Sequence, residues 1–276
     1  MLALLLLLQA APRQVTFESR DVILAGEISY PPGRGPFPGV ALVHGSGPAT
    51  REGNAPLVTL FRDLGFAVLA WDKRGTGKSG GEYRGVGVRN GDSMISLLGA
   101  DAAAAVRLLA TDQRVDAARL GLAGGSQAGW VMAAALRNAP IRFFVALSGP
   151  VVSVGEEMYF SRYFERTDRP LAEADSVMAL FSGAPGYDPL DDLRHGDAVG
   201  LYILGGLDRS VPTARSVARL QQLDASSARL SVILLPSGDH ALFDAHTGVP
   251  LSFEDDLVAW LRRVGVDTRV RGATAR

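Results

Sequence analysis

Six short, continuously apolar segments divide this chain, and they constrain its fold more than any other feature. They are residues 40–43, 66–71, 120–123, 143–147, 201–204 and 230–235. Each has the length of one strand and is apolar on both faces, which is typical of strands buried within a parallel sheet. Helical patterns separate most of them, around residues 54–64, 92–110, 126–138, 212–223 and 251–264. This alternation predicts an α/β fold with a mostly parallel central sheet and helices on both faces. Asp92 and Ser93 are the candidate N-caps of the second helix.

Two segments depart from this alternation. Residues 14–18 and 21–30 alternate apolar and polar, which predicts an antiparallel pair with a turn near Arg20. Residues 150–196 contain no strand-like run, and long segments of this kind in compact domains are often functional. We expect a small inserted cap there, although a surface segment packed for stability is the alternative. Its aromatic residues could line an apolar acyl pocket or form the cap's own core; they are Phe160, Tyr163, Phe164 and Tyr187.

The N-terminus carries an apolar run, residues 1–8, followed by Gln9 and two alanines. A membrane-spanning helix needs about 20 apolar residues, so this run predicts no stable membrane span. It resembles a secretory signal peptide, although no Lys or Arg precedes it and Leu8 is bulky for a cleavage site. We expect residues 1–11 to be a signal peptide of a secreted or periplasmic protein. The alternatives are a mis-assigned start or a short apolar tail on a cytoplasmic protein. Residues 12–276 then form one domain.

Composition excludes several classes of function. The formal net charge is -1, so no general basic field attracts nucleic acid. There is no cysteine, which excludes disulfides, thiolate metal sites and a cysteine nucleophile. The four histidines show no metal-binding spacing, and no dinucleotide fingerprint occurs, so we predict no metal and no cofactor. The Gly77-Lys78-Ser79 sequence is not a P-loop, because that pattern requires glycine where Asp72 stands. The oligomeric state stays open.

Ser126 is the candidate nucleophile. It lies in the sequence Gly-Gly-Ser-Gln-Ala-Gly, residues 124–129, between a predicted strand and a predicted helix. A serine on such a sharp turn projects its hydroxyl above the sheet, and the tight turn requires small neighbours. The G-x-S-x-G pattern is met except that Ala128 replaces the second glycine, which adds one methyl group. The helix N-terminus would place the Gln127 N–H beside a reacting oxygen.

Three further motifs follow predicted strands. In Val43-His44-Gly45-Ser46, a glycine-containing loop can bring a backbone N–H towards an oxyanion, and Ser46 is the candidate donor. We expect His44 to be structural. Asp208 follows the strand at 201–204, and His240 follows the strand at 230–235. His240 would act as the base and Asp208 would orient it, in preference to Asp239 and Asp197. The chain order of serine, aspartate and histidine is that of α/β-hydrolases.

These residues resemble the α/β-hydrolase superfamily from about Gln14 to the last helix. Residues 66–81 look like the strand and D-x-R-G-x-G-x-S loop of that family. The elbow, with Gln127 after the serine and Trp130 nearby, is similar to the G-x-S-Q-G-G-W elbow of a bacterial subgroup. That subgroup includes esterase-like and acyl-thioesterase-like proteins and relatives of serine aminopeptidases and prolyl-oligopeptidase catalytic domains. The resemblance implies the α/β-hydrolase fold and the triad, and it says little about the substrate.

The leading functional prediction is a serine hydrolase that cleaves carboxylic esters of small molecules through an acyl-enzyme. An acyl thioesterase or an aminopeptidase on the same triad is an alternative, although no acidic cluster marks a site for a substrate amino group. Cofactor-free haloperoxidase chemistry is a further alternative. A non-catalytic ligand-binding protein of the same fold belongs to another class. The complete set of catalytic residue types argues against it.

Overall fold

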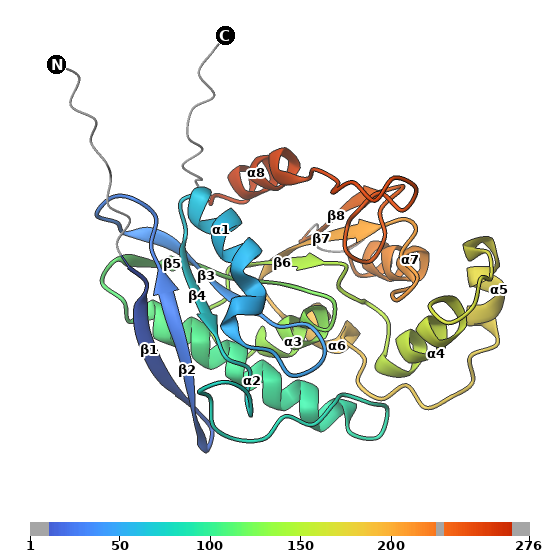
Figure 1. The fold of residues 1–276 in the computed structure, drawn as a ribbon, viewed down its shortest axis with the longest axis horizontal. Coiled ribbons are helices and arrows are strands. Elements are labelled where there is room, and N and C mark those ends of the chain that lie inside the picture. The colour runs from blue at the N-terminus through green and yellow to red at the C-terminus, as the bar shows by residue number, and fades with distance from the viewer. Residues whose placement is uncertain (1–10, 225–228, 267–276) are drawn as a thin grey trace, which may run out of the picture.

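The computed structural model describes residues 11–224 and 229–266, so the predicted signal peptide lies almost wholly outside the described residues and stays a prediction. Eight strands form one sheet in the order β1-β2-β4-β3-β5-β6-β7-β8 (Figure 1). They are β1 (Arg13–Ser19), β2 (Val22–Ser29), β3 (Phe37–Val43), β4 (Ala67–Trp71), β5 (Val115–Gly125), β6 (Phe143–Leu147), β7 (Val199–Gly205) and β8 (Leu230–Leu235).

The strand directions confirm the predicted organisation of the sheet. In sheet order, the six strands β4, β3, β5, β6, β7 and β8 pair in parallel. They correspond to the six apolar segments, with Phe66 just before β4. β1 and β2 form the predicted antiparallel pair, with Ser19 opposite Val22, and β2 joins β4 antiparallel. This is the mostly parallel sheet of the α/β-hydrolase fold.

Helices cover both faces of the sheet. One face carries α1 (Ala55–Asp63) and α8 (Glu254–Arg263), and the other carries α2 (Gly91–Ala110), α3 (Ala128–Ala135), α6 (Leu190–His195) and α7 (Thr213–Asp224) (Figure 1). Phe61 and Trp260 are buried in the first layer, and Ile95 and Val131 in the second. Burying one such side chain fully contributes about 1.5–3 kcal/mol. The two layers hold the strands in place and leave the strand ends available for loops.

The start of α2 differs from the prediction. The helix begins at Gly91 with Asn90 at the N-cap position, so Asp92 and Ser93 lie in its first turn and the predicted caps are wrong. Asn90 instead closes the preceding loop, because its side chain accepts from Gly87 N–H and donates to the Gly85 carbonyl. Asp92 still favours the helix by its negative charge near the positive end of the helix dipole.

α2 alone, among the described residues, is long and apolar enough to span a membrane by length and composition. However, 61% of its most apolar window is buried inside the structure. Ile95, Ala102 and Val106 are fully buried there. The apolar character of α2 is accounted for by the core of the domain.

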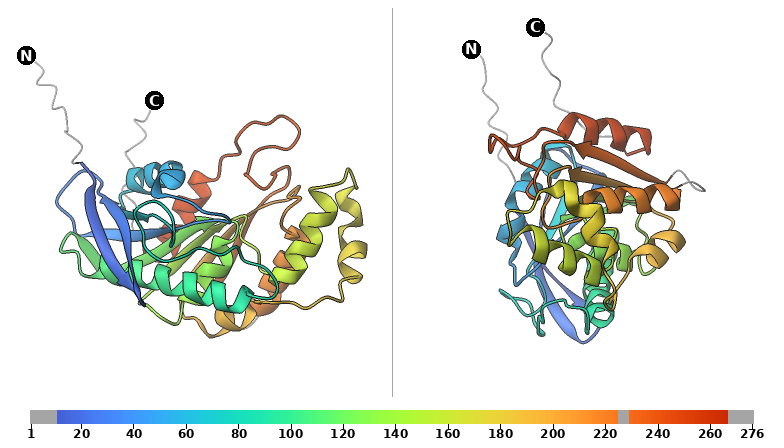
Figure 2. Two further views of the ribbon diagram at one scale, coloured as in Figure 1. Left: turned by 60° about the horizontal axis from the view of Figure 1, so that its bottom comes forward. Right: turned by 90° about the vertical axis from the view of Figure 1, so that its right-hand side faces the viewer.

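The segment predicted as a cap, residues 150–196, contains α4 (Val154–Phe164), the short 3₁₀ helix η2 (Leu171–Glu173), α5 (Ala174–Ala179) and α6. α4 and α5 project from the end of the molecule, away from the helices that cover the sheet (Figures 1 and 2). Phe160 and Phe164 pack together with Val177 and Met178 in a small separate core. These two phenylalanines therefore fit the second interpretation, in which the aromatic residues form the segment's own core.

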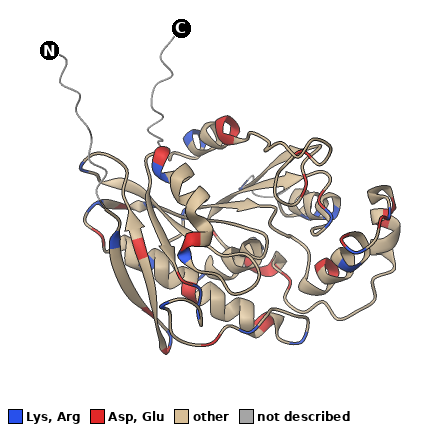
Figure 3. Ribbon diagram, in the orientation of Figure 1, with Lys and Arg blue, Asp and Glu red and all other residues tan. Residues whose placement is uncertain are grey.

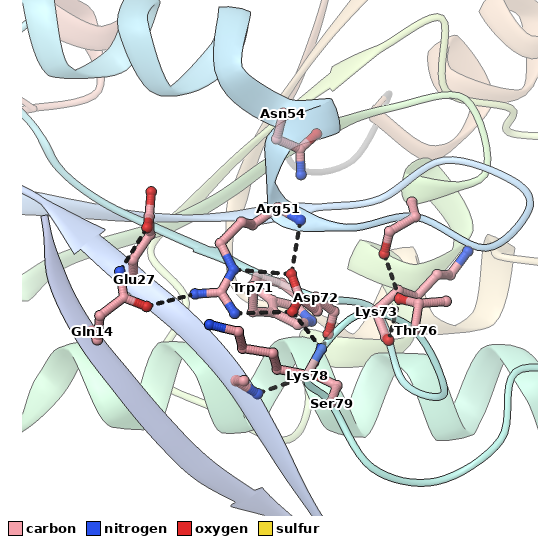
Figure 4. A network of polar contacts seen from close by, with 12 residues as sticks. Gln14, Glu27, Arg51, Asn54, Trp71, Asp72, Lys73, Thr76, Lys78 and Ser79 are labelled. Atoms are coloured by element: carbon pink, nitrogen blue, oxygen red, sulfur yellow. Dashed lines mark hydrogen bonds and ion pairs between the residues drawn. The ribbon is translucent and has the colours of Figure 1, made fainter.

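Charged side chains of both signs are spread over the elements, in keeping with the net charge of -1 (Figure 3). Some charged side chains are nevertheless buried, and three of them, Asp72, Lys73 and Arg74, are consecutive in the loop that follows β4. Asp72 is 3% exposed and accepts hydrogen bonds from Nε and Nη2 of Arg51, both at 2.9 Å (Figure 4). It also accepts from the Lys78 N–H. Burial opposes ionisation of Asp72, but these hydrogen bonds outweigh burial and lower its pKa. Asp72 thus ties this loop to η1 (Arg51–Asn54).

We expect the variant Arg51→Met to unfold much more easily than the native protein. It leaves the buried Asp72 carboxylate without its cation, and loss of one partner from a buried pair costs about 3–5 kcal/mol. Urea unfolding measures this loss. The matched control is Arg84→Met, which breaks the ion pair between Arg84 and Glu82, whose side chains are 71% and 68% exposed. That change should cost about 0–1 kcal/mol, and equal effects of the two variants would contradict the prediction.

Candidate active site

The site begins where β3 and β5 end side by side. Val43 pairs with Gly124 in the parallel register, so the loops after both strands leave the sheet at the same level. From β3 the chain continues to β4 on one side, and β5 lies on the other side. Such a reversal of strand order opens a crevice at the carboxyl ends of the strands, which is where ligands bind in α/β sheets.

Ser126 occupies a sharp turn between β5 and α3. Its φ is +57°, in the left-handed region that is unfavourable for residues other than glycine. The turn is held because the Ser126 N–H donates to the Leu147 carbonyl of β6 at 2.8 Å. Gly124 has no room for a side chain, since an added Cβ would overlap the Val43 carbonyl oxygen and lie 2.7 Å from the Ala128 Cβ. The methyl group of Ala128 is therefore accommodated because residue 124 is glycine.

Three of the predicted residues form one hydrogen-bonded series. His240 Nε2 lies 3.1 Å from Ser126 Oγ, and His240 Nδ1 lies 2.8 Å from Asp208 Oδ2. Ser126 comes from the end of β5, Asp208 from the loop after β7, and His240 from the loop after β8. With the proton of the neutral imidazole on Nδ1, Nε2 can accept the serine proton. This arrangement can activate a hydroxyl group for attack on a carbonyl.

Asp208 is held on both carboxylate oxygens. It is 2% exposed, and Oδ1 accepts from the N–H groups of Ser210 and Val211 at 2.7 and 2.9 Å. Oδ2 is left to face His240. Asp239, the neighbour of His240, instead accepts from the N–H groups of Ala241 and Phe243. Asp197 precedes β7 and lies at the opposite end of that strand.

Two further acids face His240. Burial lowers the pKa of His240, but the hydrogen bond and charge of Asp208 and the charges of Glu165 and Glu157 outweigh it, so that the pKa is raised. Glu157 is half-buried on α4. Burial, together with the charge of Glu165, raises the pKa of Glu157 to about 7. Both acids lie far from His240 along the chain, so the sequence alone shows no acidic cluster beside it.

The loop after β3 carries the predicted donor Ser46. Gly45 lies against the elbow, since an added Cβ there would be 3.6 Å from the Ser126 Cβ. Within the described part of the chain, neither the Ser46 N–H nor the Gln127 N–H donates a hydrogen bond. Both groups are thus unpaired, as donors to a substrate oxygen must be. The buried His44 has structural partners for both ring nitrogens: Nε2 contacts the Trp71 carbonyl, and Nδ1 lies near the Asn54 side chain.

An open cleft of about 470 Å³ adjoins Ser46 and Gln127. Residues of the loop at 75–86 line it as well. Among these, Tyr83 and Val86 contribute aromatic and aliphatic surface, and the Tyr83 hydroxyl accepts from the Gly47 N–H at 3.1 Å. The cleft offers space beside the two candidate oxyanion donors for part of a small substrate.

Two histidines lie away from this site. The His195 side chain is 57% exposed and contacts Arg137 and Asp191. His246 is exposed in the loop after β8. No group of three or more His, Asp or Glu residues in the described ranges is arranged to hold a metal ion. The histidines therefore give no observation that points to a metal.

Comparisons with known proteins agree with this architecture. Residues 55–265 match the prolyl oligopeptidase family, over well more than half of the chain. Esterase EstD of Thermotoga maritima is 39% identical over 69 residues, which is 21% of this chain and only 17% of that protein. The chain thus matches a small part of the length of this curated relative.

Solved structures show the same fold over most of the chain. The Pyrococcus furiosus esterase Pf2001 is 22% identical, with a TM-score of 0.67 over 91% of this chain and 90% of the other. The Pyrococcus horikoshii acylaminoacyl peptidase is 17% identical, with a TM-score of 0.64 over 96% of this chain and 43% of the other. The family match shows that the chain belongs to the prolyl oligopeptidase family, and the likeness to these structures shows that it has the α/β-hydrolase fold.

Proposed function

We propose that this protein is a carboxylesterase that uses Ser126 as nucleophile, His240 as base and Asp208 as the acid that orients the base. The observation that carries the proposal is the hydrogen-bonded series from Ser126 Oγ through the imidazole to Asp208. Both hydrogen bonds have ordinary lengths, and the serine O–H and the imidazole N–H each have one acceptor in this series. A buried carboxylate that faces Nδ1 also favours the imidazolium that forms during the reaction.

The reaction follows from this geometry. Ser126 Oγ attacks the ester carbonyl carbon while its proton passes to His240 Nε2. The carbonyl oxygen becomes an oxyanion, for which Ser46 N–H and Gln127 N–H are the proposed donors. The intermediate collapses when His240 returns the proton to the leaving alkoxide, and the acyl group stays on Ser126. Water then attacks this acyl-enzyme with His240 again as base, which releases the acid and restores the serine.

Two observations support an ester as substrate. The relatives named above include two esterases, EstD and Pf2001. The cleft beside Ser46 is open and partly apolar, which suits a small or medium acyl ester. Phe160 and Phe164 of the cap segment pack against Val177 and Met178, so we assign the acyl group to this cleft and not to those two aromatic rings.

Peptide-bond hydrolysis at a free amino terminus is the second candidate. It is favoured by Glu157 and Glu165, whose negative charges act on His240 from the side of α4. Carboxylates in such a place can attract a substrate ammonium group. A matched panel of p-nitrophenyl esters, acyl-CoA thioesters and aminoacyl-p-nitroanilides separates the substrate classes directly.

We expect Ser126→Ala to abolish hydrolysis of p-nitrophenyl esters, with kcat reduced by roughly 10⁴–10⁶ and the fold retained. The alanine keeps the backbone turn but removes the attacking oxygen. A fluorophosphonate probe should label the native protein at Ser126 and leave the variant unlabelled. If the native protein is neither active nor labelled, the proposed function is wrong and a ligand-binding role takes its place.

The charges around His240 predict a pH dependence. The base must be neutral, so kcat/KM should rise with pH through the pKa of His240, which is raised above the ordinary value for histidine. Glu157→Gln removes a negative charge that favours the imidazolium. The rise should therefore move to lower pH, by roughly half a unit or more.

The matched control for this shift is Glu173→Gln. Glu173 lies in the same segment, but its side chain is 45% exposed and pairs with Arg169. Its replacement should leave the pH profile unchanged. A Glu157→Gln profile that overlays the native one, or moves to higher pH, would show that Glu157 does not act on His240.

A further inference from the structure

Lys73 is a buried cation beside the candidate oxyanion donors. It follows Asp72 in the loop after β4 and is only 3% exposed (Figure 4). Its Nζ lies 2.7 Å from the Gly45 carbonyl oxygen, 2.9 Å from the Gly47 carbonyl oxygen and 3.1 Å from Gln127 Oε1. The Tyr83 ring lies on another side of the ammonium, with its centroid 4.1 Å from Nζ.

These contacts use the whole donor capacity of the side chain. An ammonium group has three N–H donors and no acceptor, and here three protein oxygens accept from it. Lys73 has no donor left for a substrate oxygen. Any effect on the reaction must therefore pass through the groups that Lys73 holds.

The bond to Gly45 fixes the direction of the Ser46 N–H. The Gly45 carbonyl and the Ser46 N–H belong to the same peptide unit, which is planar and trans, so they point in opposite directions. When Lys73 holds the carbonyl on its side, the N–H is directed to the other side. The bond to Gly47 fixes the loop again two residues later.

The bond to Gln127 reaches the second donor. Gln127 is 4% exposed, and its side-chain oxygen accepts from Lys73 while its backbone N–H stays unpaired. Lys73 thus connects the loop after β3 with the elbow after β5 through one ammonium group. No carboxylate forms an ion pair with Lys73 in residues 11–224 and 229–266. The neighbouring acid Asp101 is paired with Arg74.

We propose that Lys73 is a positioning residue of the oxyanion hole, which ties Ser46 to Gln127 and places a positive charge behind both donors. The inference rests on the proposed function. A buried cation without a carboxylate is costly, but here it acts on the negative charge that develops at the substrate oxygen. Preorganised charge of this kind is effective because it needs no rearrangement during the reaction.

The charge also titrates in a measurable range. Burial lowers the pKa of Lys73 to about 8. The titratable groups around it are His44, Tyr83 and Asp101. Burial and the charge of Lys73 lower the pKa of His44, which favours its neutral form. Raising the pH above about 8 should therefore convert Lys73 to a neutral amine with one N–H donor fewer, which weakens the oxyanion hole.

The test measures the rate of fluorophosphonate labelling of Ser126, because the labelled adduct places its oxygen in the hole and no natural substrate is needed. In Lys73→Met we expect the rate to fall about 100-fold, as for loss of one oxyanion donor. In the native protein the rate should rise through the His240 pKa and fall again above pH 8. In Lys73→Met the fall above pH 8 should be absent. Lys73→Gln carries the same test if the methionine variant does not fold.

Arg74→Gln is the matched control. Arg74 is the next residue, is equally buried at 3% exposure, and contacts Asp101 instead of the hole. Its replacement should lower thermal stability while the folded protein keeps the native labelling rate. The inference is overturned if Lys73→Met is labelled within threefold of the native rate, or if its slower labelling keeps the fall above pH 8. A native protein without labelling at any pH overturns the proposed function, and this inference falls with it.

Discussion

The parallel pairing of β3 with β5 is the constraint on which the rest of the site depends. Val43 and Gly124 lie opposite each other at the ends of these strands, so the two loops that follow them emerge in contact. The contact is close enough that residue 124 cannot carry a Cβ. The strained backbone at Ser126 is then supported from the next strand, through its N–H bond to Leu147. A shift of one residue in this register would reverse every side chain of the strand and separate the loop after β3 from the elbow.

Three consecutive charged residues extend this constraint to the surrounding elements. Asp72 binds Arg51 in η1, Lys73 binds the loop after β3 and the elbow, and Arg74 binds Asp101 in α2. All three are 3% exposed. Buried ionic groups add little net stability compared with apolar packing, because desolvation offsets much of the attraction. What they provide here is direction, because each side chain has its own set of partners, and of the three it is Lys73 that contacts the loop after β3 and the elbow.

The sequence predicted the features that leave a local pattern. A strand that is apolar on both faces can be recognised from its own sequence alone, and Ser126, Asp208 and His240 each follow such a strand. Pairing across long distances leaves no such pattern. Lys73 stands at an unspecified position of the D-x-R-G motif, and only the fold brings it to Gly45 and Gln127. Asp92 and Ser93 fit a capping pattern as well as Asn90 does. The helix begins at Gly91, which puts Asn90 at the N-cap position, and the Asn90 side chain closes the loop that precedes the helix.

The 150–196 segment is fastened to the same loop that carries Asp208. Arg209 donates to the Phe164 carbonyl, one of the backbone groups left free at the end of α4. It also donates to the carbonyls of Thr167 and Arg169 in the loop after α4. Ser210 donates to Glu165. At the other end of α4, Glu156 accepts from Arg215 and lies 3.4 Å from Arg219, both on α7. Glu157 follows Glu156 directly, so its distance from His240 is set by these attachments. The basicity of the proposed base therefore depends on how the segment is held as well as on Asp208.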